Sequence, residues 1–372
     1  MGFAIGLMSG TSRDGVDAAL IKTDGQQMVD PIAFHFHPYT ADVKALIGDA
    51  CNYATSCNRP HANQLIVETQ TVLNDQHVLA TRRLLEKAKL QESQIDIIGL
   101  HGHTVAHRAD LGWTWQICDP AIIANELYIQ VMSDMRRFDV MYGGQGAPLI
   151  PVFHRALFSD SVEAVAVLNL GGVANLTYLG VGGELIAFDC GMASALIDDW
   201  MSLNSNYDFD ENGDFAAKGD VDEDVLQNML SHNFFSSTFP KSLDRNDFDI
   251  RQVGHLLPAN GAATLTAFSA KAVAMGIELF PSLPRRLIVC GGGRKNRTML
   301  AMIEKYTGLP TVVSDDIGWN GDAIEAQGFA YLAFRCLHGL PITYPATTGV
   351  SEPMSGGILT KPERALRETV TA

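Results

Sequence analysis

The residues most suited to chemistry near the start of the chain lie in a short turn between two apolar runs. The turn holds Ser9, Gly10, Thr11, Ser12, Arg13, Asp14 and Gly15, and Val16 opens the second apolar run. Small residues let backbone N–H groups approach an anion, and hydroxyls add donors, which is how phosphate cradles are built. A long hairpin loop would also explain glycine and polar residues here, so the turn alone leaves both interpretations open.

Two more glycine loops follow apolar runs later in the chain. The run 164–170, which includes Asn169, leads into Gly171 and Gly172, and the run 286–290 leads into Gly291, Gly292 and Gly293. None of the three loops fits G-x-x-x-x-G-K-[ST] or G-x-G-x-x-G, so these common nucleotide motifs are missing. One glycine loop is weak support because turns need glycine. Three such loops at strand ends favour the binding of nucleotide phosphates.

A competing interpretation starts from His101 and His103. An H-x-H pair on a strand is expected to place both imidazoles on one face, a geometry that zinc ligands use. A metal-dependent hydrolase would begin from such a pair, but it would need further ligands that the other histidines do not supply. We therefore favour histidines that face a cleft, and we predict no metal-ligating residues.

Two acidic residues lie where active-site carboxylates occur in α/β folds. Asp189 follows the predicted strand 185–188, a position typical of both catalytic carboxylates and helix caps. Glu325 lies in the helix predicted after Asn320, where an exposed glutamate is the ordinary expectation.

The elements that would position these residues alternate along the chain. Apolar runs predict strands, and apolar spacings of three and four predict helices between them, which indicates an α/β protein. The second half opens with the same strand, glycine loop and strand as the first, an internal repeat of architecture. Gly143–Pro148 is a flexible stretch that we interpret as a domain junction. Two such halves imply a ligand cleft between them.

Composition narrows the class of protein further. The chain has 372 residues, of which 47% are hydrophobic, enough for about two domains on a prior of roughly 150 residues each. A net charge of −15 argues against nucleic acid or an anionic membrane as the main partner. The 6 cysteines form no CxxC pair, so we expect reduced thiols. Without a signal peptide or an apolar run of roughly 20 residues, we expect a soluble cytoplasmic protein.

A family resemblance is carried by motifs that cover nearly the whole chain. In order they are Met8–Asp17, His101–Thr104, Asp134–Arg137, Gly143–Leu149, Leu168–Asn175, Phe188–Gly191, Cys290–Gly293, Asp322–Ala326 and Thr347–Val350. With these motifs the chain resembles the anhydro-N-acetylmuramic acid kinase family, part of the superfamily of hexokinase, actin and the heat-shock chaperone ATPases. The resemblance implies a duplicated two-lobed actin/hexokinase-like fold with a central nucleotide cleft. Residues 1–133 and 340–372 would form the first lobe, and residues 134–339 the second.

The same resemblance implies the ligands and the residue roles. ATP with Mg²⁺ would bind Ser9–Val16 as the first phosphate loop, Asn169, Gly171 and Gly172 in the second, and Gly291–Gly293 at the adenosine end. Asp189 would be the catalytic base, and Thr104, Arg136 and Glu325 would contact the sugar. The implied reaction converts 1,6-anhydro-N-acetylmuramic acid, ATP and water to N-acetylmuramic acid 6-phosphate and ADP, in cell-wall recycling. The family also suggests a homodimer.

The sequence departs from the family pattern in three places. His103 stands where glutamine is usual, Cys190–Ser194 replaces a Thr-Gly-Pro-containing run, and the loop 241–245 has Leu-Asp in its middle. These departures bear on contacts to the sugar. Another sugar kinase of the superfamily is the nearest alternative, followed by an interaction protein whose ATPase drives lobe closure and by the metal-dependent hydrolase using His101 and His103.

Overall fold

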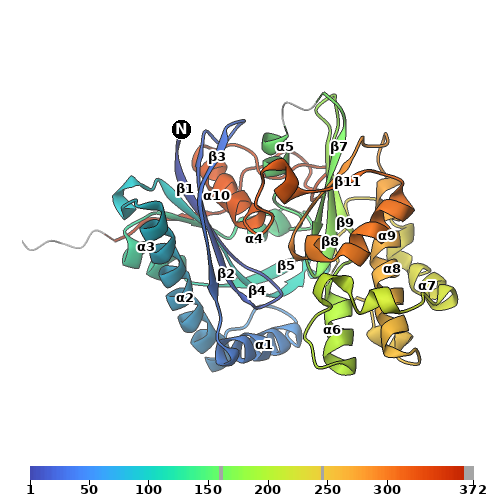
Figure 1. Ribbon diagram of the computed structural model, residues 1–372. Helices are drawn as coiled ribbons and strands as arrows, with labels where there is room; N and C mark the ends of the chain where they lie inside the picture. Colours follow the sequence, from blue (N-terminus) through green and yellow to red (C-terminus); the bar gives the residue numbers. More distant parts are fainter. Residues whose placement is uncertain (159–161, 244–246, 364–372) are drawn as a thin grey trace, which may run out of the picture.

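The computed structural model describes residues 1–158, 162–243 and 247–363, which form two lobes, each built on one β-sheet (Figure 1). The strands of the first sheet are β1 (Gly2–Ser9), β2 (Gly15–Thr23), β3 (Val29–Pro38), β4 (Ile97–Arg108), β5 (Trp113–Ile117), β6 (Val131–Ser133) and β12 (Ile358–Thr360). Those of the second sheet are β7 (Val165–Leu170), β8 (Val173–Leu179), β9 (Leu185–Met192), β10 (Leu287–Cys290) and β11 (Thr311–Val313).

The two sheets repeat one topology. The first has the order β12-β6-β4-β1-β2-β3, with β5 paired to β4, and the second has the order β11-β10-β7-β8-β9. In each sheet an antiparallel meander, β1-β2-β3 or β7-β8-β9, is extended by two parallel strands, β4 and β6 or β10 and β11. The internal repeat predicted from the glycine loops is therefore confirmed, as is the α/β class.

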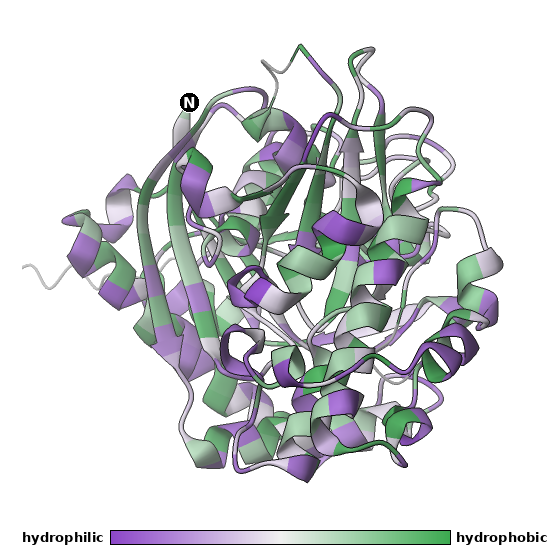
Figure 2. Ribbon diagram, turned by 45° about the vertical axis from the view of Figure 1, so that its right-hand side comes forward, coloured by the Kyte–Doolittle hydropathy of each residue, from purple (hydrophilic) through white to green (hydrophobic). Residues whose placement is uncertain are grey.

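Helices cover both faces of both sheets. The helices are α1 (Ala41–Thr55), α2 (Gln64–Ala88), α3 (Pro120–Leu127), α4 (Met135–Met141), α5 (Pro151–Leu157), α6 (Ala195–Asn204), α7 (Glu223–Leu230), α8 (Pro258–Ile277), α9 (Arg297–Thr307) and α10 (Ile324–Leu337). Figure 1 shows α1 and α2 outside the first sheet, α8 and α9 outside the second, and α10 between the two sheets. Figure 2 shows that hydrophobic residues lie along the strands and on the helix faces that cover them.

Three hydrophobic clusters correspond to these layers. One lies between the first sheet and α1 and α2, and one lies between the second sheet and α6, α8 and α9. The third lies between the sheets, where α5 and α10 pack against strands of both lobes. No helix among the described residues is long and apolar enough to cross a membrane.

Helix α10 lies unusually close to the first sheet because glycine occupies the strands beneath it. A Cβ atom at Gly6 of β1 would collide with the carbonyl oxygen of Ala326, and one at Gly99 of β4 would collide with that of Phe329. The helix therefore packs at a fixed position against β1 and β4. The predicted lobe boundaries stay a prediction, and in the structure α10 packs on β1, β2 and β4 of the first sheet.

One predicted strand differs in extent from the structure. The strand predicted over 185–188 continues to Met192, so Asp189 lies inside β9 and not at its end. Strand β4 reaches Arg108 and includes both histidines of the H-x-H pair. Near the C-terminal end of the described residues, β12 pairs with β6.

Candidate active site

The predicted nucleotide loops from the two lobes meet at one end of the sheets. The turn after β1 and the Gly171–Gly172 turn between β7 and β8 face each other, because a Cβ atom at Gly172 would lie 3.5 Å from Thr11 Oγ1. The third loop begins at Gly291 after β10, and a Cβ atom there would lie 2.5 Å from Asn169 Oδ1. The structure thus brings the three loops together.

The glycines of these loops serve two different purposes. A Cβ atom at Gly10 would have only Ser12 Oγ nearby, at 3.8 Å, and one at Gly292 would have nothing within 4 Å. At these positions the backbone borders open space, as a phosphate cradle requires. By contrast, a Cβ atom at Gly15 would collide with the His37 carbonyl oxygen, and one at Gly293 would lie 2.7 Å from Leu170 Cβ. These two glycines are needed for packing.

The side chains of the first loop also fall into two groups, one buried in the protein and one at the loop surface. Ser9 is buried, and its Oγ lies 2.8 Å from Tyr39 OH and 2.8 Å from His103 Nδ1. Val16 is fully buried in the core. Their side chains face inward, so only their backbone groups are available to a ligand in this arrangement. Thr11 is exposed at the loop surface.

The remaining loop side chains bond locally. Ser12 Oγ donates a 2.7 Å hydrogen bond to Asp14 Oδ1. Arg13 has a φ of 56°, and its guanidinium lies against Gly48 of α1, because a Cβ atom at Gly48 would be 2.7 Å from Arg13 Nη1. The turn also closes through Arg13 N–H, which donates to the Gly10 carbonyl at 3.0 Å. These contacts fasten the loop to its own backbone and to α1.

His101 and His103 point to opposite faces of the first sheet, so the expected one-face pair is wrong. His101 packs on Phe329 of α10 at a ring separation of 4.7 Å. His103 contacts Ser9 and lies with its Nε2 3.8 Å from Cys51 Sγ of α1, on the other face. The reason is Gly102, whose φ of 71° and the β-bulge in the β1–β4 register reverse the alternation. The two imidazoles therefore share no metal site.

Arg136 at the start of α4 is held by two hydrogen bonds. Its Nη1 donates to the Gly146 carbonyl at 2.6 Å, and its Nη2 lies 2.9 Å from His101 Nε2. His101 is neutral, with Nδ1 donating to the Gly102 carbonyl at 2.9 Å, because burial and the Arg136 charge hold its pKa well below the ordinary value. Within the described residues Arg136 Nε is buried without a hydrogen-bond partner.

Asp189 is a buried carboxyl poised to exchange a proton near neutral pH. Burial raises its pKa to about 7, while a hydrogen bond from Leu243 N–H to Oδ2, at 2.9 Å, and the charge of Arg136 oppose that rise. A general base is most effective when its pKa lies near the working pH. Leu243 belongs to the loop 241–245, of which residues 244 and 245 lie outside the described part of the chain.

Glu325 lies in the first turn of α10 and is partly buried, whereas an exposed side chain was expected. Burial raises its pKa and the Arg136 charge opposes that rise. The Arg136 charge therefore acts on both Glu325, a predicted sugar contact like Arg136 itself, and Asp189, the predicted base. Thr104 of β4 is partly exposed, and its Oγ1 accepts a 3.1 Å hydrogen bond from Gln116 Nε2. Within the part of the chain that the structure describes, no hydrogen bond joins Thr104 to Arg136, Glu325 or Asp189.

Several residues at the site escaped the sequence analysis. Asp17 of β2 lies beside the first loop, and burial together with the charges of Asp14 and Glu325 raises its pKa to about 8. Its place in the Met8–Asp17 motif was the available signal. Tyr39 and Arg294 gave no signal, since their partners are far away in the sequence.

A cavity of about 440 Å³ lies away from these residues. It is lined by the β2–β3 turn at Gln26, the β8–β9 turn at Gly180 and the side chains of Arg155 and Arg335. Those turns are at the opposite ends of the strands from the glycine loops. The cavity is therefore separate from the candidate active site.

Two lobes that repeat one sheet topology, with glycine loops facing each other at the ends of β1, β7 and β10, define the class of actin- and hexokinase-like ATP-using proteins. The family model described as "Anhydro-N-acetylmuramic acid kinase" matches residues 2–362. The chain belongs to the anhydro-N-acetylmuramic acid kinase family.

The curated relatives from Rhizorhabdus wittichii and Zymomonas mobilis agree with this assignment. The chain is 52% identical over 360 residues to the anhydro-N-acetylmuramic acid kinase of Rhizorhabdus wittichii, covering 96% of this chain and 99% of the relative. It is 47% identical over 358 residues to that of Zymomonas mobilis, covering 95% and 98%. Among solved structures, the activator of the 2-hydroxyisocaproyl-CoA dehydratase from Clostridium difficile aligns with a TM-score of 0.46 and 12% identity, covering 89% of this chain and 94% of that one.

Proposed function

We propose that the protein is an ATP-dependent kinase that opens 1,6-anhydro-N-acetylmuramic acid with water and phosphorylates O6, giving N-acetylmuramic acid 6-phosphate and ADP. The family and its named relatives support this activity. The observation that carries the chemistry is the buried Asp189 carboxyl, whose pKa of about 7 suits a general base. The product suits the recycling of cell-wall sugar.

In this reaction Asp189 accepts a proton from water as the water oxygen attacks the anomeric carbon. The bond between that carbon and O6 breaks, and O6 then attacks the γ-phosphorus of ATP as ADP leaves. The proton on Asp189 passes to solvent, which balances the reaction. Arg136 contributes a positive charge beside Asp189 and Glu325, and its buried Nε–H would donate to a sugar oxygen.

ATP would bind where the loops of the two lobes face each other. Backbone N–H groups beside Gly10 and Gly172 would contact the phosphates, and the open space at Gly292 would accept the adenosine end. Phosphoryl transfer asks a protein mainly for positioning and neutralisation of charge. Backbone amides supply both without a basic side chain, which suits a chain of net charge −15.

The carboxylates beside the first loop fit a magnesium ion that arrives with ATP. Beyond the effect of burial, the charge of Asp14 raises the pKa of Asp17, and a cation held by these carboxylates would relieve that repulsion. Mg²⁺ in such sites takes phosphate oxygens and waters with one or two carboxylates. When bound, the ion would neutralise charge on the transferring phosphoryl group. Asp17 and Asp14 are the residues we expect to hold it.

The deciding experiment is an NMR assay of purified protein with the anhydro sugar, ATP and Mg²⁺. The expected result is loss of the anhydro-bridge signals together with appearance of a sugar 6-phosphate in the phosphorus spectrum. Phosphorylation of N-acetylglucosamine or another open sugar, with the anhydro sugar unchanged, would instead support a different sugar kinase. Sedimentation velocity on the same sample tests the homodimer, and localisation of a tagged chain tests the cytoplasmic placement; both remain predictions.

A further inference from the structure

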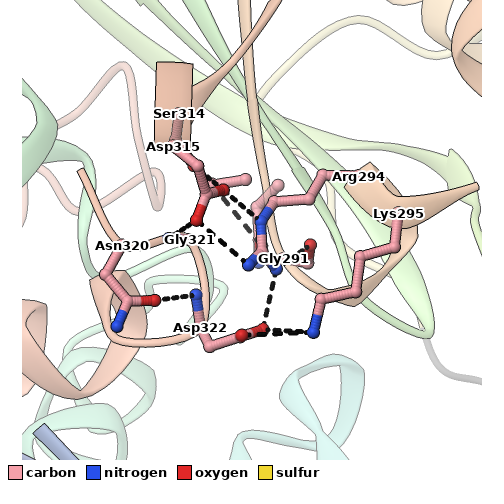
Figure 3. Close-up of polar contacts among 10 residues, drawn as sticks. Gly291, Arg294, Lys295, Ser314, Asp315, Asn320, Gly321 and Asp322 are labelled. Carbon is pink, nitrogen blue, oxygen red and sulfur yellow. Dashed lines mark hydrogen bonds and ion pairs between the residues drawn. The ribbon is translucent and has the colours of Figure 1, made fainter. Parts of the chain in front are cut away.

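A network of ion pairs joins the third glycine loop to the start of α10 (Figure 3). Arg294 follows Gly293, and its Nε donates to Asp315 Oδ2 at 2.6 Å while its Nη1 donates to Asp322 Oδ1 at 2.7 Å. The same Nη1 also donates to the carbonyl of Gly291 at 3.1 Å. One guanidinium therefore holds the glycine loop, the segment after β11 and the segment before α10.

The centre of the network is the buried, positively charged side chain of Arg294. The Arg294 side chain is only 5% exposed, while its partners Asp315 and Asp322 are 43% and 42% exposed. A lysine would not replace it, because only the planar guanidinium fork presents several fixed donors in different directions. Lys295 adds an exposed contact to Asp322, with its Nζ 3.1 Å from both carboxylate oxygens. Gly321 leaves the necessary space, since a Cβ atom there would collide with the guanidinium.

The far end of the network reaches the sugar side of the site. Asp322 lies three residues before Glu325, and its backbone N–H is fixed by Asn320 Oδ1 at 3.0 Å. Helix α10 then sits on β1 through the close approach at Gly6, three residues before Ser9. The ion pair between Arg294 and Asp322 thus links the glycine loop after β10 to the segment that leads into the first turn of α10.

We propose that Arg294 is a positioning residue that couples the nucleotide to the sugar: nucleotide bound against Gly291–Gly293 fixes Glu325 through Arg294 and Asp322. The proposal rests on the proposed function for the identity of the two ligands. In this proposal Arg294 acts through Asp322 and the Gly291 carbonyl, not by direct contact with either ligand. Its effect is on the affinity of one ligand in the presence of the other, and such coupling is typically about 5–150-fold.

The test measures binding of the anhydro sugar by calorimetry with and without a non-hydrolysable ATP analogue. In the wild type we expect the analogue to tighten sugar binding about 5-fold or more. In Arg294→Met we expect that factor to fall to about 1, while the affinity for the analogue alone changes less than about 3-fold. Arg294→Lys should recover only part of the coupling. Arg285→Met is the matched control, because Arg285 forms an exposed ion pair with Glu163 before the same strand.

A second measurement separates this inference from the proposed function. Hydrogen exchange of the amides in 324–328 is followed with the ATP analogue and no sugar. We expect the analogue to slow exchange there in the wild type and in Arg285→Met, but not in Arg294→Met. Equal protection in Arg294→Met, or unchanged sugar coupling in that variant, would overturn the role of Arg294. If the wild type bound no anhydro sugar, the proposed function would fall while the exchange measurement still tested the coupling.

Discussion

The Oγ atom of Ser9 lies 2.8 Å from Nδ1 of His103, across the junction between β1 and β4. His103 is neutral, because burial lowers its pKa to about 3. Tyr39 OH completes the buried cluster at 2.8 Å from the same serine oxygen. The hydroxyl expected to face phosphate is thus used to fix the end of β1, and the loop presents its backbone instead.

His103→Ala should therefore raise KM for ATP about 10-fold, since loss of one partner of a buried hydrogen bond costs about 1–3 kcal/mol. KM for the sugar should change much less. His103→Gln is the informative control, because its amide can still form a hydrogen bond with Ser9. Steady-state kinetics at saturating second substrate give both constants. Equal effects on the two KM values would argue against a role confined to the first loop.

Asp189→Asn should fold and bind ATP but lose about 10²- to 10⁴-fold in kcat, the usual contribution of a general base. The asparagine keeps an oxygen to accept from Leu243 N–H. Nucleotide affinity from calorimetry confirms that the site is intact. Near-normal turnover in this variant would remove Asp189 from the base role.

The pKa of Asp189 also predicts two pH profiles. Since the base must be ionised, kcat/KM should rise with pH and level off above about 7. The free energy of unfolding should instead fall as the pH rises. The folded-state pKa is raised from 3.8 to about 7, so folding loses stability as pH rises through this range, by on the order of 4 kcal/mol at most.

Thermal unfolding at two pH values checks that sign. Asp189→Asn removes the titration, so its Tm relative to the wild type should be higher at pH 8 than at pH 5. A Tm difference that does not change with pH would show that the carboxyl is not a buried acid. Because kcat and Tm move in opposite directions at pH 8, this variant separates catalysis from folding.

Two glycines of the first loop should respond differently to the same substitution. Gly10→Val places its side chain in open space, so we expect a folded protein whose ATP affinity falls far more than its sugar affinity. Gly15→Val would collide with the His37 carbonyl, so we expect loss of folded protein. Circular dichroism and calorimetry on both variants decide the matter. Loss of both affinities in a well-folded Gly10→Val would contradict a phosphate role for the loop.

Arg136→Lys should raise KM for the sugar about 10-fold or more with little effect on KM for ATP. Lysine keeps the charge near Asp189 but not the hydrogen bonds to Gly146 and His101 or the buried Nε–H. A hydrogen bond that involves a charged group contributes about 1.5–3 kcal/mol, which sets the expected scale. An unchanged KM for the sugar would place Arg136 outside the substrate contacts.

The sequence was informative wherever a local pattern determines structure. The hairpin around Ser9–Gly15 and its repeat at Gly171 both depend on residues near one another, and both are present. Asp189 was singled out from a strand pattern, although β9 extends beyond it. Such features follow from periodicity and turn chemistry.

Other features depend on residues brought together only by folding. Ser9 meets residues 30 and 94 positions away, and no local pattern indicates that its hydroxyl turns inward. The partners of Arg294 are 21 and 28 positions away. The expectation for His101 and His103 failed because strand alternation cannot reveal a bulge. The burial of Glu325 likewise depends on how α10 packs against the first sheet.

Because the side-chain alternation of β4 changes at Gly102, this strand contributes to two separate parts of the site. His101 on one side steadies the arginine proposed to meet the sugar, and His103 on the other steadies the loop proposed to meet ATP. A side chain at residue 102 would be strained at a φ of 71° and would lie 3.0 Å from the Ile117 carbonyl oxygen. A substitution at Gly102 would therefore weaken recognition of both substrates together, whereas a substitution of His101 or His103 would weaken recognition of only one.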